Sequence, residues 1–221
     1  MLTNASFPTP FGFDLPYCLS VPDDAKPGMP LIVFLHGAGE RGAGGEELSR
    51  VMNIGFGAMI REGLKLPAYV LMPQCPETCR WSDLTFPLHD LIVRVAAEIG
   101  ADPDRVTVTG ISMGGFGTWL LATAYPEMFA GIAPVCGGGN VWEAWKLTKM
   151  PVWAFHGDRD TVVPTCLSVD MADAINGYGG NARLTLLHGV DHGCWEEAYR
   201  DSRVVGWLLE QKRPAADGDN A

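Results

Sequence analysis

A serine lies at a glycine-rich junction in the middle of the chain. The stretch Gly110-Ile111-Ser112-Met113-Gly114 follows a run of Val and Thr and precedes a segment with helical character. It matches the G-x-S-x-G pattern, in which a strained serine sits on a sharp turn from a strand into a helix. Glycines two positions before and after the serine avoid a collision between the strand and the helix. The pattern therefore predicts Ser112 as an exposed nucleophile, with helix amide groups close to it.

A serine hydroxyl needs a neighbouring base, and the base needs a carboxylate that orients it. After a turn of this kind the acid and then the histidine follow the serine along the chain. His188 and His192 are late enough in the chain to qualify. His188 closes the apolar run "RLTLLH" and is expected to pack or bond locally. His192 lies in the loop "GVDHGCW", and a loop can reach over the serine, so we predict His192 as the base.

Two aspartates are candidates for the acid. Asp158 and Asp160 both follow an apolar run in "AFHGDRDTVVP". Asp160 is deeper in the loop, and the residues after it turn the chain towards the next helix. We predict Asp160 as the orienting acid and keep Asp158 as the alternative, whose other role would be capping of the loop.

Two backbone N–H groups are expected to stabilise negative charge on a substrate oxygen. The tight turn in "FLHGAGERG" points one N–H towards the serine, and the residue after the nucleophile supplies the second. We assign these donors to Ala38 and Met113, with Gly39 as the alternative to Ala38 and as a substrate contact. Glu40 and Arg41 next to this turn form either a bracing ion pair or two solvated charges.

An alternation of strands and helices is needed to position these residues. Short apolar runs, typical of strands that are covered on both faces, occupy residues 31–37, 68–74, 105–110, 130–137, 151–157 and 183–189. Segments with helical spacing lie between and after them, at residues 46–62, 86–100, 114–125, 167–177 and 195–211.

This order predicts a doubly wound α/β domain with a mostly parallel sheet over residues 1–212. An extended segment near residues 13–21 is expected to add an edge strand, and the tail 213–221 is expected to be disordered. Ligands of such sheets bind beyond the carboxyl ends of the strands, where the serine, the acid and the histidine all fall.

Composition excludes several classes of partner. The chain has 221 residues and a net charge of −10, which gives no electrostatic footprint for nucleic acid or an anionic membrane. No run is long enough for a membrane span, and the N-terminus lacks the features of a signal peptide. Six scattered cysteines are expected to be reduced, with a metal or disulfide at Cys75 and Cys79 as minor alternatives. We therefore expect a cytoplasmic protein, monomeric or a small homo-oligomer.

The motifs together resemble the α/β-hydrolase superfamily, and more closely its small serine esterases. These include carboxylesterase/phospholipase, dienelactone-hydrolase-like, and polyhydroxybutyrate-depolymerase or feruloyl-esterase-like proteins. The resemblance runs from about residue 11 to 212 and rests on "HGAGERG", "PQCPETCRW", "GISMGGFGTW", "HGDRDTVVP" and "GVDHGCWEEAY" in this order. Dienelactone hydrolases themselves carry a cysteine where this chain has Ser112, so lactone cleavage by a thiol is not expected.

This resemblance implies the α/β-hydrolase fold without a large lid domain, because only "GGNVWEAWKLTK" occupies the usual place of a lid. It also implies that Trp81, and to a lesser extent Trp195, line the pocket. The expected activity is hydrolysis of soluble short-chain or small aromatic esters through an acyl-enzyme, with no metal or organic cofactor. Cleavage of amides or thioesters on the same triad, and an inactive binding protein on this fold, are the alternatives.

Overall fold

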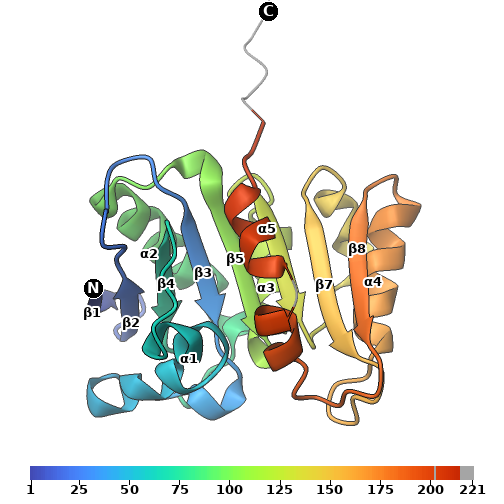
Figure 1. Cartoon of the computed structure of the whole chain (residues 1–221), viewed down its shortest axis with the longest axis horizontal. Coiled ribbons are helices and arrows are strands. Elements are labelled where there is room, and N and C mark those ends of the chain that lie inside the picture. Colours follow the sequence, from blue (N-terminus) through green and yellow to red (C-terminus); the bar gives the residue numbers. More distant parts are fainter. Residues whose placement is uncertain (202, 215–221) are drawn as a thin grey trace, which may run out of the picture.

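One sheet of eight strands organises the residues that the structure, a computed structural model, describes, which are 1–201 and 203–214. The strand order is β1-β2-β4-β3-β5-β6-β7-β8, and the strands from β3 to β8 run parallel (Figure 1). Their bounds are Leu2–Pro8 (β1), Asp14–Ser20 (β2), Leu31–Leu35 (β3), Tyr69–Pro73 (β4), Val106–Ile111 (β5), Gly131–Val135 (β6), Val152–Gly157 (β7) and Ala182–Leu187 (β8).

Helices cover both faces of this sheet, as expected for a doubly wound domain. Their bounds are Gly55–Arg61 (α1), Thr85–Ile99 (α2), Met113–Ala124 (α3), Cys166–Gly177 (α4) and Val204–Glu210 (α5). Side chains of α2, α3 and α4 belong to one apolar core, and those of α1 and α5 belong to the other. The central strands are buried at every position, because both of their faces are covered in this way.

The predicted α/β-hydrolase architecture without a lid is confirmed. Between β6 and β7 the chain forms only a 3₁₀ segment, Val141–Leu147, which packs against α3 and α4. In the part of the chain that the structure describes, no helix is long and apolar enough to cross a membrane.

The N-terminal edge of the sheet differs from the prediction. The expected edge strand is β2, but β1 pairs with it antiparallel from Leu2↔Ser20 to Pro8↔Asp14 and takes the edge position. The sequence of β1 carries little apolar patterning because most of its side chains are exposed. Its existence depends on the hydrogen bonds to β2 rather than on burial.

Two predicted helices are each divided into two segments. The helix expected at 46–62 is a 3₁₀ segment, Gly45–Asn53, followed by α1, whose first residue, Gly55, has a φ of +52°. The helix expected at 195–211 starts as a π-helical turn, Glu197–Asp201, and continues as α5. Tyr199 of the π-helical turn and Val204 of α5 both belong to the same apolar core.

Hydrogen bonds hold the chain against the domain shortly after the end of α5. Arg213, the first residue of the predicted tail, donates from its guanidinium to the Asp104 carboxylate at 2.7 Å. Its amide also donates to Asp104 O at 2.8 Å. Arg213 makes these contacts within the predicted tail, whose residues 215–221 lie outside the described residues.

Candidate active site

Ser112 occupies a strained turn between β5 and α3. Its φ is +52° and its ψ is −116°, a backbone conformation that non-glycine residues rarely adopt. A Cβ atom at Gly110 would lie 2.5 Å from Gly114 O, and a Cβ atom at Gly114 would overlap Leu35 O. The two glycines of the motif are thus required by the close approach of β3, β5 and α3, and the turn brings the Ser112 hydroxyl to the carboxyl edge of the sheet.

His192 connects this hydroxyl to the predicted acid. His192 Nε2 lies 2.8 Å from Ser112 Oγ, and His192 Nδ1 lies 2.7 Å from Asp160 Oδ2. Asp160 comes from the loop after β7, and His192 comes from the loop after β8. The side chain of Asp160 is fully buried, whereas 18% of the His192 side chain is exposed. The three groups form one hydrogen-bonded chain that ends at solvent on the serine side.

The Asp160 carboxylate is held in its charged form. Burial acts to raise its pKa, but hydrogen bonds from His192 and from the amides of Val163 and Val162 outweigh burial, and the pKa is lowered. Both amides donate to Oδ1, at 2.8 and 2.9 Å. Oδ2 is therefore left to interact with the histidine, whose Nδ1 proton it fixes.

The alternative acid and histidine form a separate pair. Asp158 Oδ2 lies 2.7 Å from His188 Nδ1, and the Gly189 amide donates to Asp158 Oδ1 at 2.7 Å. The His188 side chain is 90% exposed. This pair ties the loops after β7 and β8 together, which agrees with the local role expected of His188 and the loop-capping role considered for Asp158.

A cavity of about 380 Å³ opens beside the serine. Ala38 and Met113, the predicted backbone donors, both line it together with Ser112. Met113 is the first residue of α3, and the first N–H groups of a helix have no partner within the helix. Gly39 follows Ala38 in a single 3₁₀ turn, Ala38–Glu40, and does not line the cavity.

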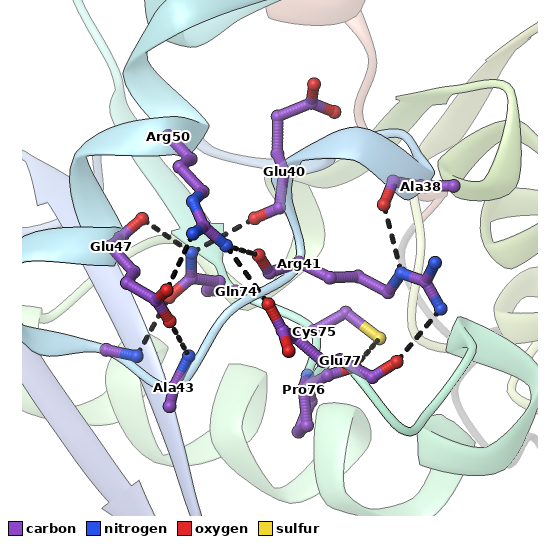
Figure 2. Close-up of polar contacts among 11 residues, drawn as sticks. Ala38, Glu40, Arg41, Ala43, Glu47, Arg50, Gln74, Cys75, Pro76 and Glu77 are labelled. Carbon is purple, nitrogen blue, oxygen red and sulfur yellow. Dashed lines mark hydrogen bonds and ion pairs between the residues drawn. The ribbon is translucent and has the colours of Figure 1, made fainter.

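Arg41 braces the turn that carries Ala38 (Figure 2). Its Nε donates to Ala38 O at 2.9 Å and its Nη1 donates to Glu77 O at 3.0 Å. The ion pair considered between Glu40 and Arg41 does not form. Glu40 is instead largely buried, one of its oxygens has no hydrogen-bond partner among the described residues, and burial raises its pKa.

Gln74, at the end of β4, holds the next part of the same loop. Its buried amide nitrogen donates to Glu40 O at 3.0 Å and to Glu47 O at 2.7 Å, while its oxygen accepts from the Gly44 amide at 3.0 Å. Arg50 completes the network shown in Figure 2 by donating to Arg41 O at 2.6 Å. Side chains on a strand and on a 3₁₀ segment thus fix a loop that has little regular structure of its own.

Comparison with known proteins identifies relatives of this chain. A sequence model of the Dienelactone hydrolase family matches residues 82–210, more than half of the chain. The chain belongs to the dienelactone hydrolase family. It is also 32% identical over 196 residues to the Poly(3-hydroxyalkanoate) depolymerase C of Paucimonas lemoignei, covering 76% of this chain and 42% of that protein.

Solved structures resemble this family member over nearly its whole length. A thermostable esterase superposes with a TM-score of 0.83 at 33% identity, covering 96% of this chain and 63% of that chain. Est1E from Butyrivibrio proteoclasticus, at 15% identity, shares the fold with a TM-score of 0.69 over 93% of this chain and 98% of its own. The chain thus spans less than two thirds of the depolymerase and of the thermostable esterase.

The two tryptophans assigned to the pocket of this dienelactone hydrolase family member differ in position. Trp81 lines the cavity but is almost fully buried, and its Nε1 donates to His36 O at 2.9 Å. Trp195 does not line the cavity. Its ring instead meets the His192 ring edge-on, with centroids 5.8 Å apart, and packs against the core.

Several cavity residues were missed by the sequence analysis. Phe116 and Leu120 of α3 form part of the wall, and they follow Ser112 at intervals of four residues. This spacing places them on one helix face and could have revealed them. Arg41, Arg80 and Ser82 also line the cavity, but their loops have no periodicity from which their direction could be predicted.

Proposed function

We propose that this protein is a serine carboxylic-ester hydrolase. Ser112 attacks the ester carbonyl while His192 removes its proton, and Asp160 stabilises the resulting imidazolium. The amides of Ala38 and Met113 bind the oxyanion. His192 then protonates the leaving alcohol, and water hydrolyses the acyl-enzyme by the same steps. The observation that carries this proposal is the continuous chain of hydrogen bonds from Ser112 through His192 to Asp160.

The cavity supports a small acyl group as the substrate. Its volume of about 380 Å³ is near the lower end for ligand pockets, and its walls include Trp81, Met113, Phe116 and Leu120. No cap extends these walls, because the connection between β6 and β7 is short. We therefore propose soluble esters with short or small aromatic acyl groups as substrates.

Labelling with a fluorophosphonate and a panel of esters test the proposal together. The wild-type protein is expected to be labelled at Ser112 and to hydrolyse p-nitrophenyl acetate and butyrate faster than the corresponding anilides. Faster cleavage of anilides would indicate an amidase that uses the same triad, and faster cleavage of acyl thioesters would indicate a thioesterase. Absence of both labelling and turnover would favour an inactive binding protein.

A further inference from the structure

His156 is a buried histidine that takes no part in the mechanism above. It is the penultimate residue of β7, and its side chain has no exposed surface. Its Nε2 lies 3.1 Å from Asp160 Oδ2 and 3.0 Å from Val163 O. The Asp160 carboxylate oxygen that accepts from His192 therefore also lies close to a second, fully buried imidazole.

The partners of His156 determine where its protons lie. Val163 O and the ionised Asp160 carboxylate are both acceptors, so Nε2 carries a proton. Nδ1 lies 2.7 Å from Ser168 Oγ on α4, whose hydroxyl is also 2.8 Å from Gly137 O. Burial lowers the pKa of His156, which favours a neutral ring with the proton on Nε2. The Ser168 hydroxyl donates to Gly137 O, and its oxygen holds the ring in place from the Nδ1 side.

We propose that His156 is a positioning residue that holds the Asp160 carboxylate for His192. Its Nε2–H donates to Val163 O, which fixes the loop whose amides bind Oδ1, and the same group lies 3.1 Å from Oδ2. The inference rests on the proposed triad. A series of neighbouring side chains thus leads from α4 to the cavity, in the order Ser168, His156, Asp160, His192 and Ser112. In it, the buried His156 and the partly exposed His192 both lie close to the same carboxylate oxygen.

This arrangement limits the basicity of Asp160 as well as its motion. A second N–H group beside Oδ2 withdraws negative charge that would otherwise stabilise the His192 imidazolium alone. Without the Nε2–H group beside Oδ2, the negative charge on Oδ2 acts on His192 alone, and the carboxylate is less firmly held against Nδ1. Loss of His156 should therefore move the pH profile of kcat/KM upwards and lower kcat, while substrate binding in the cavity is unaffected.

Other ionisable groups also surround this pair. On α4 the residues that pack inwards are Ser168, Met171, Ala172 and Ile175, while Asp170 and Asp173 are exposed. From the loop after β6, Cys136 faces Asp160 as a thiol that burial keeps neutral by raising its pKa. The loops after β7 and β8 themselves contribute Asp158, Arg159, His188, Asp191 and Cys194.

The test compares His156→Leu with His156→Gln, because the glutamine side chain can place an amide N–H near the position of Nε2. For His156→Leu we expect a kcat about tenfold lower and a pH midpoint of kcat/KM that rises by about half a unit or more, with KM within about twofold of wild type. His156→Gln should return the midpoint towards the wild-type value. Activity is measured on p-nitrophenyl acetate between pH 5 and 9.

Phe155→Leu is the matched control. Phe155 is the preceding residue of β7, is equally buried and faces the opposite core, so this variant loses stability without changing the contacts of Asp160. An unchanged midpoint in both His156 variants, or an equal shift in Phe155→Leu, would overturn the inference. If His156→Leu fails to fold, His156→Asn, whose shorter side chain cannot reach Asp160, takes its place and should show the raised midpoint and slower fluorophosphonate labelling, and a wild-type midpoint in it would overturn the inference. Full activity of Ser112→Ala would instead refute the proposed triad itself.

Discussion

Ser112 Oγ makes a hydrogen bond to one side chain, His192, so its removal should affect chemistry far more than folding. We expect Ser112→Ala to lower kcat/KM for p-nitrophenyl esters by on the order of 10³-fold or more, since the members of a triad act as a unit. The melting temperature should change little, and labelling by a fluorophosphonate should be lost. Turnover at the wild-type rate would show that another residue is the nucleophile.

The two late histidines provide a matched pair at the same scale. His192→Ala should be as inactive as Ser112→Ala, because the hydroxyl loses its base. His188→Ala should keep nearly all activity, since His188 is exposed and contacts Asp158 rather than Asp160. The pair is compared by steady-state kinetics at pH 8. An inactive His188→Ala with an active His192→Ala would reverse the assignment.

At the scale of elements, the turn between β5 and α3 depends on the close approach of three backbones. A methyl group at Gly114 would overlap Leu35 O, so Gly114→Ala must push α3 away from β3 and displace the serine. We expect a loss of about 1–3 kcal/mol in the free energy of unfolding, as for other overpacked sites, together with loss of activity. Urea unfolding measures the first effect and ester turnover the second.

Gly206 in α5 is the control for this substitution. A Cβ atom there meets nothing within 4 Å, and alanine in a helix is favoured over glycine by about 1 kcal/mol. Gly206→Ala should therefore stabilise the protein and leave turnover unchanged. Equal stability losses in both glycine variants would contradict the steric explanation of the G-x-S-x-G motif in this chain.

The loop after β3 contains a histidine that makes stability depend on pH. Burial lowers the pKa of His36 to about 4, below its ordinary value of 6.5. The neutral ring donates from Nδ1 to Gly37 O and accepts the Cys75 amide at Nε2. In the pH range between the two values the unfolded chain binds a proton that the folded protein excludes, so stability is complete above pH 6.5 and falls as pH decreases towards 4.

From these two pKa values, His36 should cost about 2 kcal/mol of stability at pH 5 relative to pH 7.5. His156, whose pKa is also lowered by burial, acts in the same direction. The decisive measurement is the change in urea midpoint between the two pH values for wild type and His36→Gln. The change should be smaller in the variant, which has no proton to gain at this position, and an equal change would exclude His36 as the source.

At the scale of the whole molecule, the described residues form no cap over the cavity, and this limits what the cavity can bind. Its apolar wall can bury only a few methylenes, and each one adds up to about 0.8 kcal/mol. We therefore expect kcat/KM to rise with acyl chains up to roughly two to six carbons and then to stop rising. Activity measured across the solubility limit of the substrate should show no jump. Preference for emulsified long-chain triglycerides would contradict this view of the cavity but not the triad.

The sequence by itself determined the parallel sheet, the position of the serine turn and the order of serine, acid and histidine. These are properties of local spacing and chain order: apolar runs mark the strands, and the glycines around Ser112 mark a turn that larger residues cannot enter. These features were enough to predict the fold class, because each buried strand appears in the sequence as an apolar run.

Only the tertiary structure decided which side chains meet. Asp158 and Asp160 are two residues apart, yet Asp158 contacts His188 and Asp160 contacts His192. The packing of the loops after β7 and β8 against each other determines these pairs. Chain order had excluded His156 as a base, yet the fold places it against Asp160. Arg41 likewise contacts the Ala38 carbonyl rather than Glu40. Such contacts depend on the directions of loops from different strands, and no periodicity in the sequence records those directions.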